Sequence, residues 1–330
     1  MDFNLDETQQ DVRKLAAEVL AKDGGEAGLR QAGLLSLCVP EEAGGAGLGP
    51  VEMAVVLREV GAKAAAVPAL PALAGTLALA RYGSPGQQRR HADGVALAVR
   101  EPGRALAAPP ATVATVATPA REDGGGWTLT GRKATVVHPG PAALVTADEG
   151  LFLVTAPAAT PEYTSTGEPA ATLTFDATPA ERVAGPEAAD GLRRLYTGAI
   201  AAQASGVLAG ALELTTAHIR TRRQFGRALA EFQAVTVQIA DVYIAGRALD
   251  VAMWSALWRL GAGLPAEEDL ALAAYHAAEA VKALHICQHL HGGLGLDVTY
   301  PLHRYFAQAK HLSHLLGGAD AQLDLIGALV

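Results

Sequence analysis

The stretch TRRQFGRALAEFQAV, residues 221–235, has the residue types of a nucleotide-binding surface. Arg222 and Gln224 precede Phe225 and a glycine, and Gln233 follows after a short link. A guanidinium binds a phosphate through two parallel hydrogen bonds, and a glycine lets backbone approach a flat or anionic ligand closely. An ordinary basic helix end, where arginine is favoured near the negative pole of the helix, explains the same residues equally well. The spacing alone leaves both interpretations open.

A second candidate stretch, CQHLHGGLGLDVTYPLHRYFAQAKHL at residues 287–312, combines histidines with a pair of glycines. His289 and His291 precede Gly292 and Gly293. Histidine clusters can bind metals, but these residues lack the carboxylate ligands and the HExxH spacing of a zinc site. We therefore predict no metal site.

The composition favours packed helices. Of the 330 residues, 50% are hydrophobic but only 5% are aromatic, and alanine is abundant. The net charge of -8, without a basic tract, argues against a nucleic-acid partner. The acidic N-terminus has no apolar signal core, and prolines interrupt the alanine-rich run at residues 64–80, so we predict no membrane segment and a cytoplasmic protein. Cys38 and Cys287 are predicted to be buried free thiols in a reducing compartment.

Helical patterns fill the first part of the chain. Residues 5–21 place apolar side chains on one stripe, and a glycine-containing break follows at residues 23–28. A glycine-rich loop at residues 40–49 ends at Pro50, which can begin a helix because its missing amide hydrogen is not needed there. A further helix is predicted over residues 67–82.

Between residues 95 and 183 the pattern changes to short runs, which predict strands of a small barrel or sandwich. These runs are VALAVRE, TVATVAT, WTLTGRKATVV, AALVTAD, LFLVTAP and ATLTFD. Residues 123–126 give a hairpin-turn signal. After residue 185, helical periodicity returns with breaks that delimit about four long helices, which is typical of an antiparallel bundle. The predicted class is α+β, mainly α, because helices and strands do not alternate as in a doubly wound fold.

Three runs resemble signatures of the acyl-CoA dehydrogenase family, flavoenzymes that desaturate acyl-CoA thioesters. Residues 221–235 are similar to its R-x-x-F-G-x-x-[hydrophobic]-x-x-F-Q signature. Residues 287–312 are similar to its Q-x-x-G-G-x-G run, which a Y-P-[hydrophobic]-x-R run follows. Residues 32–61 are similar to its N-terminal run G-L-[small]-x-x-x-V-P-E-x-x-G-G-x-G. The resemblance covers nearly the whole chain and implies an N-terminal helical domain at 1–92, a middle β-barrel or sandwich domain at 93–187 and a C-terminal four-helix bundle at 188–330.

The resemblance implies FAD as the cofactor. In the family, the first stretch holds the pyrophosphate and adenine of an FAD that sits mainly in a neighbouring subunit, and the second touches the ADP portion across the subunit boundary. His289 replaces the family's glutamine and can still donate one hydrogen bond. The residues that the resemblance assigns to the cofactor are Arg222, Gln224, Phe225, Gln233, His289, Gly292 and Gly293.

The resemblance is incomplete where the family places its catalytic base. Desaturation needs a carboxylate that removes the proton beside the thioester carbonyl while the flavin accepts a hydride. The family's two positions for this glutamate match Gly317 and a site near Tyr196, and neither residue can act as the base. Asp320 and Asp190 are the nearest carboxylates but are displaced along the chain. We therefore predict no catalytic residue in this chain.

The loops that hold the flavin ring in the family also differ here. The family carries T-E-P-x-[AG]-G-S-D and K-x-W-I-[TS], whereas this chain has REPGRALA at residues 100–107 and KATVV at residues 133–137. Glu101 persists, but the serine and aspartate are missing and Thr135 stands in place of the tryptophan. The comparison implies that the half-site offered to a neighbour is kept and the chain's own ring pocket is lost.

This asymmetry leads to the hypothesis of a heteromeric enzyme. The chain is predicted to be a non-catalytic subunit, inactive alone, in a heterotetramer with a homologous catalytic acyl-CoA dehydrogenase subunit. Its similarity to short paired subunits of bacterial steroid degradation implies a bulky steroid side-chain acyl-CoA as substrate, with electron-transfer flavoprotein as acceptor. Two alternatives stay open. One is a homotetrameric enzyme with a relocated base, such as Glu213 or Asp241, and the other is a non-enzymatic scaffold of the same fold.

Overall fold

The computed structural model describes residues 3–22, 25–117 and 126–329. The chain divides into two compact units. Unit 1 comprises residues 1–23, 54–65 and 198–330, and unit 2 comprises residues 24–53 and 66–197. Each unit is described by itself. The domain boundaries at residues 92 and 187 stay a prediction.

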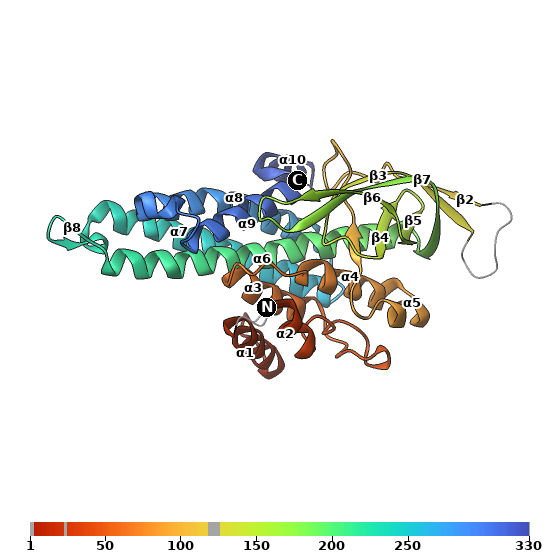
Figure 1. Cartoon of the computed structure of the whole chain (residues 1–330), viewed down its shortest axis with the longest axis horizontal. Coiled ribbons are helices and arrows are strands. Elements are labelled where there is room, and N and C mark those ends of the chain that lie inside the picture. Colours follow the sequence, from red (N-terminus) through yellow and green to blue (C-terminus); the bar gives the residue numbers. More distant parts are fainter. Residues whose placement is uncertain (1–2, 23–24, 118–125, 330) are drawn as a thin grey trace. The chain divides into compact units, whose positions relative to one another are not determined.

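Unit 1 is a bundle of helices (Figure 1). Within it, α8 packs against α7, α9 and α10. The predicted helix at residues 5–21 is confirmed, and it begins with a capping box in which Asp6 and Gln9 satisfy each other's backbone amides. The helices that lie wholly or partly in unit 1 are α1 (Glu7–Ala21), α3 (Pro50–Ala62), α6 (Pro186–Thr221), α7 (Gln233–Gly261), α8 (Glu267–His291), α9 (Leu302–Leu316) and α10 (Gly318–Leu329).

Two helices of unit 1 touch through their backbones because the contact residues are glycines. A Cβ atom added to Gly206 of α6 would lie 1.9 Å from the carbonyl oxygen of Arg58 in α3. A Cβ atom added to Gly61 of α3 would lie 2.1 Å from the carbonyl oxygen of Gln203. Interiors pack at the density of crystals, so side chains at these positions would force the helices apart.

A buried ionic network joins the same two helices to α7. The Asp250 side chain accepts hydrogen bonds from Ser205 Oγ at 2.5 Å, Arg58 Nη2 at 3.4 Å and Arg247 Nη1 at 3.3 Å. Asp250 is only 9% exposed. Burying a carboxylate costs desolvation free energy unless hydrogen bonds or opposite charges compensate for it, and here three donors from three helices do so.

Unit 2 combines short helices with the strands. The helix α4 (Ala69–Tyr82) confirms the prediction over residues 67–82 and is buried over most of its length. The predicted break at residues 23–28 is wrong where it overlaps α2 (Gly25–Gln31), because two glycines within this short helix looked like loop residues. The 3₁₀ helix η1 (Glu41–Ala43) and α5 (Pro85–Arg90) also lie wholly in unit 2, which contains the first residues of α3 and α6 as well.

The strands form one hydrogen-bonded set in the order β1-β4-β5-β7-β3-β2, with β6 paired to β7. Only the β1–β4 pair is parallel among the described strands. The strands are β1 (Ala96–Ala98), β2 (Val113–Val116), β3 (Trp127–Val137), β4 (Ala142–Ala147), β5 (Gly150–Thr155), β6 (Ala158–Tyr163) and β7 (Pro169–Ala184). Each predicted run contains a strand, whereas β6 was not predicted. The hairpin turn predicted at residues 123–126 rests on residues 123–125, which lie outside the described part.

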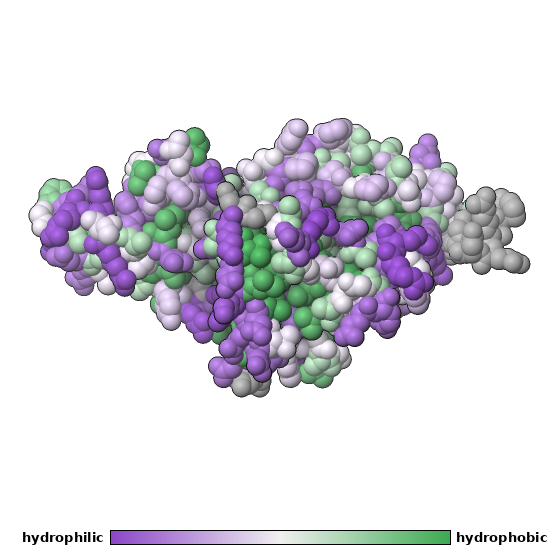
Figure 2. Space-filling model, turned by 60° about the horizontal axis from the view of Figure 1, so that its bottom comes forward, coloured by the Kyte–Doolittle hydropathy of each residue, from purple (hydrophilic) through white to green (hydrophobic). Residues whose placement is uncertain are grey.

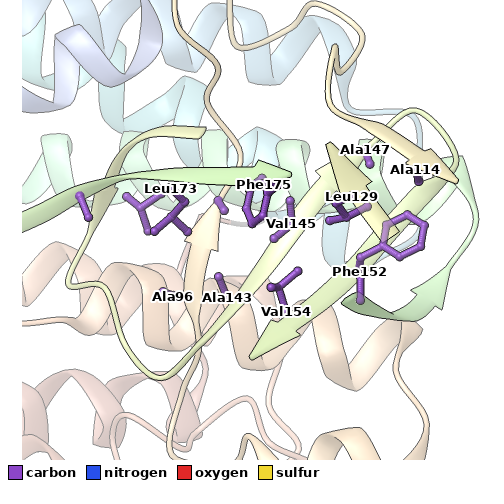
Figure 3. Close-up of a cluster of buried hydrophobic side chains, with 14 residues drawn as sticks. Ala96, Ala114, Leu129, Ala143, Val145, Ala147, Phe152, Val154, Leu173 and Phe175 are labelled. Atoms are coloured by element: carbon purple, nitrogen blue, oxygen red, sulfur yellow. The ribbon is translucent and has the colours of Figure 1, made fainter. Parts of the chain in front are cut away.

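The core of the strand region is small and aliphatic, with few aromatic rings (Figure 3). Leu129, Val145, Phe152 and Phe175 come from four different strands and are each at most 2% exposed. Trp127 packs against this core, with its ring centroid 5.4 Å from that of Phe152. This packing holds β3, β4, β5 and β7 together and so fixes the loops that leave them.

The helix α6 is long and apolar enough to cross a membrane by length and composition, and it is the only such helix among the described residues. In the folded chain, 83% of its most apolar window is buried. The core helix of a globular protein passes the same test, so this helix is weak evidence for a membrane span.

Candidate functional site

The segment between α6 and α7 is a short hairpin that carries two of the predicted cofactor residues, Gln224 and Phe225, and directly follows a third, Arg222. The strands β8 (Arg223–Gln224) and β9 (Arg227–Ala228) pair in antiparallel register. The two turn residues, Phe225 and Gly226, both have positive φ, at 52° and 81°. A two-residue hairpin turn of this kind matches the twist of its strands. The part of unit 1 around this hairpin, at the left of Figures 1 and 2, is mostly hydrophilic.

A pocket of about 590 Å³ lies where this hairpin meets the end of α8 within unit 1. It brings together five of the seven predicted residues: Arg222, Gln224, His289, Gly292 and Gly293. Arg222 and His289 are exposed. No atom lies within 4 Å of a Cβ atom built on either glycine, so ligand can approach this backbone closely. The structure thus joins two segments that are more than sixty residues apart in the chain.

The other two predicted residues do not line the pocket. Phe225 is 91% exposed at the hairpin tip, and its ring makes an edge contact with Phe232 at 6.4 Å between centroids. Gln233 is exposed at the first position of α7. Arg227 lies over the ring of Phe232 at 3.9 Å, which fixes this side of the hairpin.

The pocket has the electrostatics of an anion site. Its charged or titratable lining consists of Arg222 and three histidines, and no carboxylate lines it among the described residues. Aliphatic side chains of Leu229, Val235 and Leu294 complete the wall. A guanidinium, the exposed imidazole of His289 and open glycine backbone beside apolar surface fit the phosphates and base of a nucleotide. The residues present therefore fit the ADP portion of FAD.

Four further residues of this wall were not predicted from the sequence, and they come from α6, from α7 and from the segment between these helices. His218 lies one helical turn before Arg222, so both face the pocket. Gln238 and Val235 come from α7, and Leu229 from η2 (Leu229–Glu231). The i, i+4 spacing of His218 and Arg222 is a signal that could have identified His218.

The positions that match the family's catalytic glutamate do not carry a base. Gly317 ends α9 in a left-handed conformation with φ of 86°. Tyr196 is buried, and burial raises the pKa of its phenol to about 12. Asp190 forms an ion pair with Arg193 of the same helix. Asp320 lies in the first turn of α10, where the helix dipole stabilises a negatively charged side chain. Each of these residues has a structural role.

The alternative bases lie on exposed helix surface. Glu213 of α6 and Asp241 of α7 are both exposed. Neither lines the pocket described above. A general base that abstracts a carbon-bound proton works best in a site that excludes water. Because Glu213 and Asp241 are exposed to water in the single chain, the structure does not support either of them as a relocated base.

Residues 100–107, the first of the two segments that match the family's ring-binding loops, are held in place by a buried ion pair in unit 2. Glu101 accepts a hydrogen bond from Lys133 Nζ at 2.7 Å, and Lys133 is completely buried. Glu101 also accepts bonds from Ala111 N, Thr112 N and Thr112 Oγ1. Burial alone would raise the pKa of Glu101, but these donors outweigh it and lower the pKa to about 2. The carboxylate is therefore fully engaged inside the protein.

Within the described residues, no group of three histidine, cysteine, aspartate or glutamate side chains could hold a metal ion. His291 illustrates the reason. Its Nδ1 lies 2.8 Å from the carbonyl oxygen of Cys287, and its Nε2 lies 3.2 Å from the hydroxyl of Tyr300. Both ring nitrogens are thus already engaged by protein groups.

Comparison with known proteins identifies the class. The family model for the acyl-CoA dehydrogenase C-terminal domain matches residues 197–330, and the model for the N-terminal domain matches residues 6–97. The chain is 38% identical to the acyl-CoA dehydrogenase FadE28 of Mycobacterium tuberculosis over 99% of its own length and 98% of that protein. It is 36% identical to FadE27 of the same organism over 91% of its own length and 86% of that protein. The chain belongs to the acyl-CoA dehydrogenase family.

Solved structures of two-subunit assemblies are among its neighbours. One is described as the Tcur3481–Tcur3483 steroid acyl-CoA dehydrogenase, a G363A variant, with a TM-score of 0.89, 35% identity and coverage of 98% of this chain and 97% of that one. Another is the ChsE4–ChsE5 complex of Mycobacterium tuberculosis, with a TM-score of 0.87, 33% identity and coverage of 99% and 98%. Butyryl-CoA dehydrogenase of Megasphaera elsdenii has the same fold, with a TM-score of 0.83, 21% identity and coverage of 100% and 99%.

Proposed function

We propose that this chain is the non-catalytic subunit of a heteromeric, FAD-dependent acyl-CoA dehydrogenase. The proposal rests mainly on one contrast. The pocket around Arg222 is open and suited to a nucleotide, whereas the positions of the family's base hold Gly317 and the buried Tyr196. The similarity to the two-subunit structures supports a homologous catalytic partner.

In the proposed complex, residues of this chain bind the ADP portion of an FAD that is seated mainly in the partner. Arg222 binds the diphosphate through charge-assisted hydrogen bonds. Gln224 and His289 form hydrogen bonds, as donors or acceptors, with polar atoms of the nucleotide. Gly292 and Gly293 leave room for the ligand against their backbone. When bound, FAD accepts the hydride in the desaturation of an acyl-CoA thioester. This chain's contribution is binding and orientation, and the base comes from the partner.

The proposed substrate is a bulky steroid side-chain acyl-CoA, with electron-transfer flavoprotein as the acceptor. The description of the Tcur3481–Tcur3483 structure as a steroid acyl-CoA dehydrogenase supports the substrate class. The acceptor is carried over from the family resemblance alone. We propose a cytoplasmic location, because two buried free thiols suit a reducing compartment.

A surface of α7 is suited to an association between subunits. Val237, Ile244, Val251 and Trp258 recur every seven residues along this helix and are between 41% and 62% exposed. Side chains seven residues apart lie on one face of a helix, so these four form an apolar seam along α7 that can pack against another helix. We assign this seam, defined by these four residues, to the interface with the homologous partner.

The replacement Ile244→Glu is expected to shift the proteins from a mixed complex toward separate subunits, because a charge would have to be buried in the seam. Light scattering coupled to size-exclusion chromatography of the co-purified proteins measures the shift. The matched control is Leu15→Glu on α1, which changes a side chain that is 41% exposed outside the seam and should leave the complex intact. An intact complex with Ile244→Glu would show that the seam is not the interface.

The replacement Arg222→Ala is expected to weaken FAD retention in the mixed complex by about 1.5–3 kcal/mol, which is the loss of a charge-assisted hydrogen bond. Equilibrium dialysis followed by flavin absorbance measures the retained cofactor. Arg220→Ala is the control, because Arg220 is an exposed arginine in the last turn of α6, two residues before Arg222, and does not line the pocket. Full FAD retention by Arg222→Ala would remove Arg222 from the cofactor site.

Co-expression with a homologous catalytic subunit, followed by mass measurement and an absorbance spectrum, tests the proposed function itself. We expect one flavin for every two chains, and no acyl-CoA oxidation by the isolated chain. Stoichiometric flavin and turnover in the chain alone would instead support a self-sufficient enzyme. A mixed complex without flavin would support a scaffold.

A further inference from the structure

A pair of histidines in the nucleotide pocket has no role in the family resemblance. His218 of α6 and His291 of α8 stack with ring centroids 4.2 Å apart and an angle of 19° between the rings. Both residues line the pocket together with Arg222 and His289. The two helices thus bring together rings that are 73 residues apart in the chain.

The ring of His291 is held rigidly and is 6% exposed. A carbonyl oxygen only accepts hydrogen bonds, so Nδ1 must carry the hydrogen and donate to the Cys287 carbonyl oxygen at 2.8 Å. In the neutral ring, Nε2 is then the acceptor, and the Tyr300 hydroxyl donates to it at 3.2 Å. With both nitrogens in use, His291 offers a ligand no ring nitrogen, but it provides a fixed platform.

His218 rests on this platform and is only partly buried. Across residues 3–22, 25–117 and 126–329, no protein group forms a hydrogen bond with its ring nitrogens. One ring face is covered by His291, so the ring keeps its orientation while its nitrogens stay available. An oriented donor one helical turn from Arg222 suits a ligand that Arg222 also binds.

We propose that His218 is a further nucleotide-binding residue, which donates a hydrogen bond to a phosphate of the bound dinucleotide, and that His291 and Tyr300 position it. This inference rests on the proposed function of the pocket. A phosphate is the favoured recipient because Arg222, the cation of the pocket, lines it beside His218 and donates its backbone amide to the carbonyl oxygen of His218 at 2.8 Å. His218 is thus placed to join Arg222 at the diphosphate.

The proposal implies that nucleotide affinity depends on pH. The groups facing His218 are His291 and His289 of α8 and Arg222, which directly follows α6, while α7 contributes the uncharged Ala234, Val235 and Gln238. Burial, and then the charges of His291 and Arg222, lower the pKa of His218, so its ring is mainly neutral in the empty pocket at neutral pH. A bound phosphate favours the protonated ring, and affinity should therefore rise as the pH falls.

The test is calorimetric titration of the full chain with ADP between about pH 8 and about pH 6, a range that brackets the ordinary histidine pKa. We expect the affinity of the wild type to rise on the order of tenfold across this range. His218→Gln keeps a hydrogen-bond donor but cannot titrate, so it should bind ADP with little dependence on pH. His291→Phe keeps a stacking platform but loses both hydrogen bonds, and it should bind ADP more weakly than the wild type.

His289→Gln removes another histidine of the same pocket. It should weaken ADP binding, because His289 is assigned to the nucleotide, but the affinity that remains should keep its pH dependence. Adenosine, which lacks phosphate, should bind without pH dependence in every variant. The inference is overturned if His218→Gln retains the wild-type pH profile, if His289→Gln alone abolishes it, or if the wild-type chain does not bind ADP. The flavin content of the mixed complex is measured in parallel. If the inference about His218 fails but the mixed complex contains flavin, the proposed function is still supported. If the mixed complex contains no flavin, the proposed function is wrong.

Discussion

Glu101→Ala is expected to lower the free energy of unfolding by about 3–5 kcal/mol, the usual cost of removing one partner from a buried ion pair. Lys133 would be left completely buried, with Thr146 Oγ1 at 3.0 Å as its remaining side-chain partner. Burial already lowers the pKa of Lys133 to about 8, although Glu101 acts to raise it. Urea unfolding followed by circular dichroism measures the change.

Glu42→Ala is the control for this experiment. Glu42 is an exposed carboxylate of η1, and its replacement should change the free energy of unfolding by no more than about 0.5 kcal/mol. Equal losses in the two variants would contradict the stabilising role of the Glu101 pair. A large loss in Glu101→Ala alone supports it.

The Glu101–Lys133 pair also makes the free energy of unfolding depend on pH in the acidic range. The pKa of Glu101 is about 2 in the folded protein, below its ordinary value of 4.5, so the unfolded chain binds the proton more readily. The stabilisation from Glu101 is therefore complete above pH 4.5 and is lost as the pH falls toward about 2. Glu101→Gln should remove this part of the acid dependence, as measured by urea unfolding across that range. An unchanged acid profile would argue against the pairing.

Gly206→Ala is expected to destabilise the protein by about 3 kcal/mol, at the upper end of the cost of overpacking a core. The added methyl group would meet the carbonyl oxygen of Arg58, which is backbone and cannot rotate away. Separation of α3 and α6 would also stretch the bonds that Asp250 accepts from Arg58 and Ser205. Thermal unfolding followed by circular dichroism reports the loss.

Gly246→Ala on α7 is the matched control for Gly206→Ala. A Cβ atom at Gly246 would meet Leu208 only at 3.8 Å, which is an ordinary contact. Alanine has the higher helix propensity by about 1 kcal/mol, so this replacement should be neutral or stabilising. A Gly206→Ala protein as stable as Gly246→Ala would show that the two helices can separate without cost.

The regular elements of this protein were largely predictable because their patterns are local. The apolar stripe of α1, the proline at the start of α3 and the alternating runs of most strands each carry their signal within one segment. The strand β6 was missed because Pro161 interrupts it and its residues are mostly exposed, so no apolar alternation marks it. The helix α2 was missed because its glycines resemble a loop.

The candidate site was predictable only in part, since its chemistry depends on distant contacts. The resemblance pointed to Arg222 and His289, which the structure places in one pocket. The stacking of His218 on His291 depends on the relative register of α6 and α8, which no short motif encodes. The burial of Lys133 within β3 likewise depends on Glu101, which lies 32 residues earlier in a loop. Tertiary contacts of this kind are invisible to pattern reading.

The two cysteines, predicted and found to be buried free thiols, divide evenly between the units. Cys38 belongs to unit 2 and Cys287 to unit 1. Burial raises the pKa of both thiols, that of Cys287 to about 11, so little reactive thiolate forms in the native protein. Alkylation of either cysteine consequently requires a local or global opening of its surroundings. The native chain thus contains one built-in chemical reporter of opening for each unit, and peptide mapping after brief alkylation can reveal which unit opens first.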